Sequence, residues 1–168
     1  MSEEVPVLSR EEGLAKIGEL IKDIQMAMLT TITAAGTLHS RPMATHQGRF
    51  EGELLFLTPA HSGKVEEIQQ DAEASLTYVD AKHAFLAVRG RASLSADREL
   101  IETLWNPSYK AWFPAGKDDP EIRVLKVKVE EAEYWDAPSS AIVRSAKILA
   151  RAVSGGKTKV GEHARVAL

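Results

Sequence analysis

Cysteine is absent from this chain of 168 residues. Disulfide bonds, thiolate metal sites and a cysteine nucleophile are therefore excluded. Long apolar runs are also missing, and no stretch approaches the ~18 apolar residues that a membrane-spanning helix needs. The N-terminal segment carries Glu3 and Glu4 and has no apolar run, so it does not have the pattern of a signal peptide. These absences favour a cytoplasmic protein without a membrane partner.

An excess of positive charge is missing as well. The chain has 21 Lys and Arg against 24 Asp and Glu, and the net charge of −3 argues against a dedicated nucleic-acid binder. The five histidines show no metal-type spacing such as H-x3-H, so no metal site is predicted. No G-x-S-x-G motif supports a serine hydrolase. The apolar share of 44% and the charged share of 27% are typical of a globular domain with a sizeable core.

Six segments have the composition of β-strands and are separated by turn residues. They cover residues 26–33, 37–47, 53–58, 74–79, 83–95 and 122–130. Because short turns join most of them, the sequence predicts an antiparallel barrel rather than a parallel sheet. Gly90, in the middle of the fifth segment, indicates a bulge or close packing.

Four other segments are expected to be helical. Ser9 and Glu12 form an S-x-x-E capping box, and apolar residues follow at helical spacing. Ser62 is expected to cap the second helix. The helices cover residues 9–23, 62–70, 97–105 and 139–153. We assign residues 1–153 to one domain that includes the N- and C-terminal helices, and residues 154–168 to a C-terminal tail.

Two basic residues lie where a phosphate could bind. Lys64 opens the second helix, whose N-terminus offers unpaired backbone N–H groups, and Ser62 adds a hydroxyl. Arg41 lies in the second strand, and its planar fork suits bidentate phosphate contact. Its neighbour Pro42 has no N–H, which leaves an interruption where a ligand can approach the backbone. Two ordinary alternatives stay open: a Ser-capped helix with a solvated Lys, and a surface Arg on an edge strand.

Aromatic side chains gather late in the sequence. The segment 105–113 and the Tyr134-Trp135 pair contain all three tryptophans. Such rings could cover a planar cofactor or a dimer interface, and they could equally belong to the core.

Taken in order, these motifs resemble a known family. L-T-T-I-T with a glycine turn, then S-R-P-M, L-F-L-T and S-G-K, resemble the flavin-binding split barrel of the pyridoxamine 5′-phosphate oxidase-like superfamily. V-R-G-R-A, L-W-N-P, A-W-F-P-A-G-K-D-D-P and A-E-Y-W-D-A-P resemble its general stress protein 26 branch. The resemblance implies a mainly β (α+β) fold, namely a six-stranded antiparallel split β-barrel with flanking helices. It also implies a homodimer with FMN at the subunit interface, and FAD is the alternative cofactor.

The resemblance further implies roles for particular residues. It assigns the flavin phosphate to Arg41 and Lys64, with Ser62 beside them. The strand after the arginine and the end of the third strand line the flavin ring and ribityl chain, and an aromatic residue approaches from the other subunit. These positions correspond here to Pro42, Met43, Ala44, Phe56, Leu57 and Thr58, and to Trp135 as the partner aromatic. No acid or base is evident near the ring, so the catalytic residues stay unknown.

The sequence departs from the oxidase pattern at two places. The oxidase has Arg-Lys where this chain has Gly63-Lys64. It also has a basic segment that holds pyridoxal phosphate, where this chain reads Ser-Ser-Ala-Ile-Val-Arg at residues 139–144. We therefore expect an FMN-binding protein of general stress type, a flavin-dependent oxidoreductase of unknown substrate, and not an efficient pyridoxamine 5′-phosphate oxidase. The alternatives are a non-catalytic flavin-binding stress protein and a related barrel that uses deazaflavin or haem.

Overall fold

The structure is a computed structural model of the chain, and it describes residues 5–46, 48–80, 84–136, 148–149, 152 and 161–168. Its strands are β1 (Val7–Leu8), β2 (Met26–Ile32), β3 (Leu38–Ala44), β4 (Glu53–Pro59), β5 (Glu73–Val79), β6 (Ala84–Ser95), β7 (Ile122–Asp136) and β8 (Glu162–Ala167). Its helices are α1 (Arg10–Ile21), α2 (Gly63–Gln70), α3 (Arg98–Leu104) and the 3-10 helix η1 (Pro107–Ala111).

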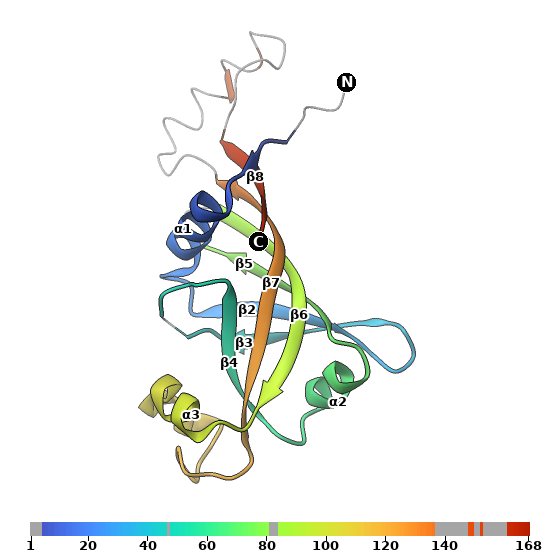
Figure 1. Cartoon of the computed structure of the whole chain (residues 1–168), viewed down its shortest axis with the longest axis vertical. Helices are drawn as coiled ribbons and strands as arrows, with labels where there is room; N and C mark the ends of the chain where they lie inside the picture. Colours follow the sequence, from blue (N-terminus) through green and yellow to red (C-terminus); the bar gives the residue numbers. More distant parts are fainter. Residues whose placement is uncertain (1–4, 47, 81–83, 137–147, 150–151, 153–160) are drawn as a thin grey trace.

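The predicted mainly β, α+β fold is confirmed, and the six predicted strands correspond to β2–β7. The prediction of six strands, all antiparallel, was wrong. The described part of the chain forms an eight-stranded sheet, and β1 pairs with β8 in parallel. The two additional strands come from the chain ends, where β8 lies within the segment predicted as a tail. Figure 1 shows β8 beside the last part of β7.

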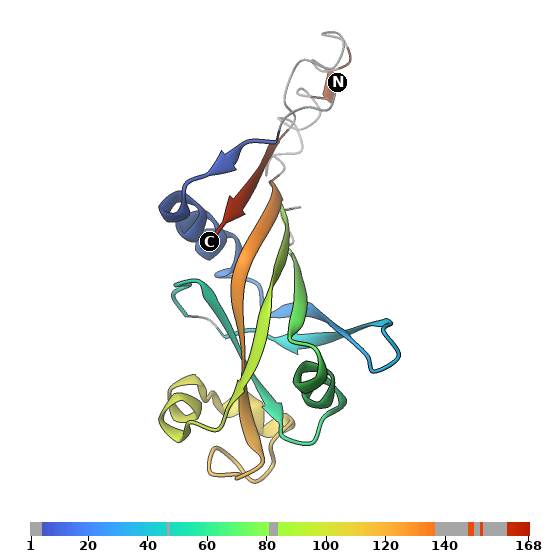
Figure 2. The same ribbon diagram turned by 45° about the vertical axis from the view of Figure 1, so that its right-hand side comes forward.

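The sheet has the order β1-β8-β7-β6-β5-β2-β3. In addition, β4 pairs with the first part of β7, on the edge of β7 opposite to β6. Of the described strands, β3 pairs with β2 only and β4 with β7 only, so the barrel is open at a seam between β3 and β4. This arrangement is split-barrel-like. Figures 1 and 2 both show the β2–β3 hairpin projecting from the body on the side of α2.

Local sequence explains several of these elements. The Ser9 side chain accepts a hydrogen bond from the Glu12 backbone N–H, and the Glu12 carboxylate accepts one from the Ser9 N–H at 3.1 Å, which confirms the predicted capping box. In β7, alternating apolar residues face the interior, as the sequence predicted. At Gly90 the register between β6 and β7 shifts, and a Cβ there would lie 2.1 Å from the Lys128 carbonyl oxygen. The glycine therefore permits the close approach of the two strands.

Two apolar clusters form the core. The larger one fills the barrel and includes Leu29, Phe56 and Leu76. The smaller one packs α3 and η1 against the ends of β4 and β7. The predicted helix at residues 139–153 lies outside the described residues, apart from residues 148, 149 and 152. None of the helices in the described ranges is long and apolar enough to cross a membrane.

Candidate functional site

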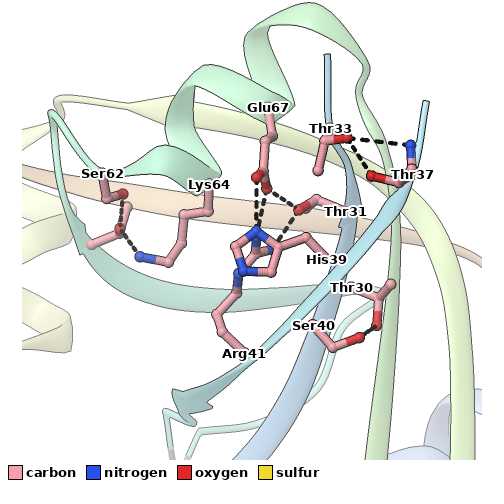
Figure 3. Close-up of polar contacts among 11 residues, drawn as sticks. Thr30, Thr31, Thr33, Thr37, His39, Ser40, Arg41, Ser62, Lys64 and Glu67 are labelled. Atoms are coloured by element: carbon pink, nitrogen blue, oxygen red, sulfur yellow. Dashed lines mark hydrogen bonds and ion pairs between the residues drawn. The ribbon is translucent and has the colours of Figure 1, made fainter. Parts of the chain in front are cut away.

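Three predicted site residues meet at the start of α2 (Figure 3). The Lys64 Nζ donates to Thr58 Oγ1 at 3.3 Å, and Thr58 Oγ1 lies 3.1 Å from Ser62 Oγ. Lys64 is half-buried; its burial, followed by the positive charge of Arg41, lowers the pKa of its ammonium group, while Glu67 opposes this. Ser62 is the N-cap residue of α2, as predicted, but its hydroxyl contacts Thr58 and makes no hydrogen bond to the backbone N–H groups of the helix.

Arg41 extends from β3 toward the same helix. Its guanidinium donates to Thr31 Oγ1 on β2, and its Nη2 lies 2.5 Å from Glu67 Oε2 on α2. The side chains of Arg41 and Glu67 are each only 13% exposed. The alternative of a solvated surface Arg is therefore excluded for this residue. In this structure Arg41 is a largely buried cation that already has a carboxylate partner.

Glu67 has three polar neighbours. Its Oε2 accepts a hydrogen bond from Thr31 Oγ1 at 2.5 Å, and its Oε1 lies 2.9 Å from His39 Nδ1. Burial alone raises the pKa of this carboxyl, but the hydrogen bonds from Thr31, His39 and Arg41, together with the Arg41 charge, lower its pKa to about 2. Glu67 is thus ionised at neutral pH.

Sequence reasoning missed Glu67, Thr31 and His39. One signal was available for Glu67, which follows Lys64 by three positions on a predicted helix and therefore shares its face. The contacts of Thr31 and His39 depend on how β2 and β3 pair, so they emerge only from the fold.

The predicted ring-lining residues do not all face one space. The side chains of Met43 and Phe56 are buried in the barrel core, so only their backbone could meet a ligand. Leu57 packs into the smaller cluster under α3 and η1, with Ala44 against it. Pro42 is exposed. Their assignment to the flavin ring stays a prediction.

A cavity of about 570 Å³ lies between the ends of β2 and β3 and the α3–η1 segment. Its walls include Ala44 at the end of β3, His46 two residues further along the chain, and the aromatic rings of Trp105, Tyr109 and Trp112. No Lys, Arg, Asp or Glu lines it within the described part of the chain. Burial lowers the pKa of His46, which favours its neutral form. The cavity can therefore hold a planar, uncharged group against aromatic walls.

Trp135 lies far from this region within one chain. It is near the end of β7, where it pairs with Phe85 on β6 and His163 on β8. Figure 1 shows that end of β7 beside β8 and α1, at the opposite end of the molecule from α2. A single chain does not bring Trp135 to Lys64.

Trp135 belongs to an apolar surface on the outer face of the sheet. Cross-strand pairs join Trp135 to Phe85 and Phe85 to Val79. In the next row, Thr77 pairs with Met28, and Met28 pairs with Pro42. The large side chains of this surface are 40–53% exposed. We call this set the outer-face patch: Met28, Pro42, Val79, Phe85 and Trp135. Soluble proteins seldom leave such a contiguous surface uncovered.

Comparison with known proteins agrees with the resemblance seen in the sequence. A family model described as "Pyridoxamine 5'-phosphate oxidase like" matches residues 12–159. General stress protein 26 of Bacillus subtilis is 25% identical over 136 residues, which cover 77% of this chain and 93% of that protein.

Two solved structures are similar in fold. One, from Jannaschia sp. CCS1, superposes with a TM-score of 0.77 at 20% identity and covers 94% of this chain and 99% of its own. The other is the general stress FMN/FAD binding protein from Xanthomonas citri, with a TM-score of 0.67 at 25% identity, covering 77% of this chain and 92% of its own.

Proposed function

The chain belongs to the pyridoxamine 5′-phosphate oxidase-like family, and from this premise we propose that it is a cytoplasmic flavin-binding protein of general stress type. FMN is the proposed cofactor, with FAD as the alternative. The printed description of the Xanthomonas citri structure, a general stress FMN/FAD binding protein, supports the cofactor class.

One observation carries the proposal: Arg41, in the middle of β3, belongs to the polar cluster with Lys64, and Ala44, at the end of the same strand, lines the aromatic cavity. Arg41 and Ala44 are separated by about 10 Å along an extended strand at ~3.3 Å per residue. The ribityl chain of a flavin, which joins the phosphate to the ring, spans a distance of this order. The cluster offers two cations and hydroxyls to a phosphate. The cavity offers uncharged aromatic walls to a planar ring.

The open seam of the barrel provides a path between these two places. The strand edges of β3 and β4 that face the seam carry backbone groups not used in pairing by the described residues. A ligand that lies along this seam meets Arg41 and Pro42 on one strand and Thr58 on the other. The side chains that face the core, Met43 and Phe56, would support the two strands from behind. The chain's own residues thus bind and orient; a flavin, when bound, supplies the hydride and electron chemistry.

We propose that two copies of the chain associate through the outer-face patch. A cofactor of this size needs an enclosing cleft, and the interior of one barrel is filled by its own side chains. The patch begins at Pro42, beside Arg41, and ends at Trp135. A symmetric dimer over this face can therefore carry Trp135 of one subunit toward the flavin site of the other.

An absorption spectrum of the purified protein tests the cofactor. Flavin bands support the proposal, and release of the chromophore by acid followed by chromatography separates FMN from FAD. A Soret band would instead identify haem as the cofactor, and the spectrum of a deazaflavin would identify that cofactor. Turnover with NADH or NADPH would identify an oxidoreductase, whereas bound flavin without turnover would identify a protein that stores or buffers the cofactor.

A further inference from the structure

Glu67 occupies the fork of Arg41 in the proposed phosphate site (Figure 3). Both terminal nitrogens of the guanidinium are engaged: Nη1 donates to Thr31 Oγ1, and Nη2 lies 2.5 Å from Glu67 Oε2. A bidentate contact with phosphate uses two neighbouring donors of this fork. A phosphate that approaches this end of Arg41 therefore competes with contacts that the protein already makes.

The carboxylate of Glu67 is also held without Arg41. Thr31 Oγ1 donates to Oε2 at 2.5 Å, and His39 Nδ1 lies 2.9 Å from Oε1. The side chain is only 13% exposed, so solvent and salt screen its charge little. Its negative charge remains beside the site even when Arg41 turns to another anion.

Glu67 also changes the net charge of the cluster. Arg41 and Lys64 supply two positive charges and Glu67 one negative charge, so these three side chains together carry one net positive charge. A phosphate monoester carries about −1.5 to −2 at neutral pH. Glu67 thus cancels half of the formal positive charge that would receive the phosphate, and it repels the phosphate itself.

We propose that Glu67 is a built-in competitor of the flavin phosphate, which neutralises Arg41 in the cofactor-free chain and keeps the affinity for FMN moderate. This inference rests on the proposed function, because it takes Arg41 and Lys64 as phosphate ligands. When a flavin binds, Arg41 would exchange the Glu67 carboxylate for the phosphate, and the reverse exchange would accompany release. An exchangeable cofactor is the property that a flavin-buffering protein requires.

The variant Glu67→Gln tests the charge, because it keeps the size of the side chain and an acceptor oxygen. FMN and riboflavin, which has no phosphate, are titrated into the cofactor-free variant and wild-type protein. We expect Glu67→Gln to bind FMN about 10-fold more tightly, the size of one charge-assisted contact, with riboflavin affinity changed less than about twofold. Glu66→Gln is the matched control, since it removes the same charge from the neighbouring, exposed residue of α2; it should leave FMN affinity within about twofold.

The outcomes separate the inference from the function on which it rests. Selective weakening of FMN by Glu67→Gln would show that Glu67 orients Arg41 for the phosphate, and it would overturn competition. Equal changes for FMN and riboflavin, or for the two glutamate variants, would overturn it as well. If neither flavin binds the wild-type protein or the variant, the proposed function fails and the inference fails with it.

A measurement on the wild-type protein tests the proposal even if the Glu67→Gln variant does not fold. In a crystal structure of the FMN complex, we expect Arg41 on the phosphate and Glu67 left with Thr31 and His39. An Arg41–Glu67 pair that persists unchanged beside the bound phosphate would overturn the proposal.

Discussion

The indole of Trp135 stacks on the imidazole of His163, with ring centroids 5.0 Å apart and an angle of 21° between the planes. The imidazole in turn contacts the Glu133 carboxylate at 2.5 Å, and Arg165 Nε lies 3.4 Å from the same carboxylate. Strand β8 thus supports Trp135 from one side, while Phe85 on β6 lies on its other side. A braced aromatic side chain that remains 40% exposed is suited to contact a second molecule.

This arrangement predicts how the proposed homodimer can be dissociated. Phe85→Glu places a charge in the centre of the outer-face patch, and its burial in an interface without a partner is strongly unfavourable. We expect light scattering at micromolar concentration to give the dimer mass for wild-type protein and the monomer mass for the variant. Val7→Glu is the control, because Val7 is also exposed but lies on β1 at the far edge of the sheet. A monomeric wild-type protein would contradict the proposed dimer.

The phosphate assignment predicts ligand-specific effects of two alanine variants. Arg41→Ala and Lys64→Ala should each weaken FMN binding by about 10- to 150-fold, from the loss of a charge-assisted contact of ~1.5–3 kcal/mol. Riboflavin lacks the phosphate, so its affinity should change little. Lys22→Ala, at the exposed end of α1, serves as the control for removal of one positive charge. Equal losses of affinity for both ligands would show that these residues do not bind the phosphate.

The depressed pKa of Glu67 predicts a loss of stability in acid. Its carboxyl has a pKa of about 2 in the folded chain against the ordinary 4.5, so the ionised form favours folding above pH 4.5. This contribution, on the order of 3 kcal/mol at neutral pH, should disappear as the pH falls from about 5 toward 2. Urea unfolding of wild-type and Glu67→Gln proteins without flavin measures it. A difference in unfolding free energy that stays constant over this pH range would contradict the assignment.

The features that the sequence predicted correctly depend on local interactions. The Ser9–Glu12 capping box, the six strands β2–β7 and the bulge at Gly90 all depend on residues close in sequence or on steric rules for one position. Arg41 and Lys64 were identified because a guanidinium fork and a cation at a helix N-terminus suit a phosphate, although the residues alone also allowed a surface Arg and a solvated Lys. Their proximity to one another followed from the resemblance and not from the residues alone.

The missed features depend on contacts between distant segments. β8 has only Ala164 and Val166 as buried apolar positions, too few to mark a strand until β7 lies beside them. Likewise, Glu67 has the sequence pattern of a solvated helix residue, and only the pairing of β2 with β3 brings Thr31 and Arg41 to it. Tertiary packing, which a single sequence encodes weakly, decides both cases.

The final prediction is that the protein does not act as an efficient pyridoxamine 5′-phosphate oxidase. That reaction needs a second phosphate-bearing ligand at the flavin, and a dianionic phosphate requires several cations or backbone donors. The cavity next to Ala44 has no Lys or Arg among its described lining residues, and burial favours neutral His46 there. In the proposed function, Arg41 and Lys64 bind the flavin phosphate and are not available for a second one.

The basic side chains that β8 brings near Trp135 do not remedy this lack. Arg165 lies 3.4 Å from the carboxylate of Glu133, which offsets its charge, and the His163 imidazole contacts the same carboxylate. Arg144, the first cation after Trp135 in the sequence, lies outside the described residues. To test this, flavin-loaded protein is incubated with pyridoxamine 5′-phosphate and oxygen, and the pyridoxal phosphate formed is measured against time. In a parallel assay the bound flavin is first reduced, and its reoxidation by an uncharged aromatic acceptor such as a quinone is measured. We expect less than one pyridoxal phosphate per flavin; many turnovers would show that a second phosphate site exists where this structure places aromatic and neutral side chains.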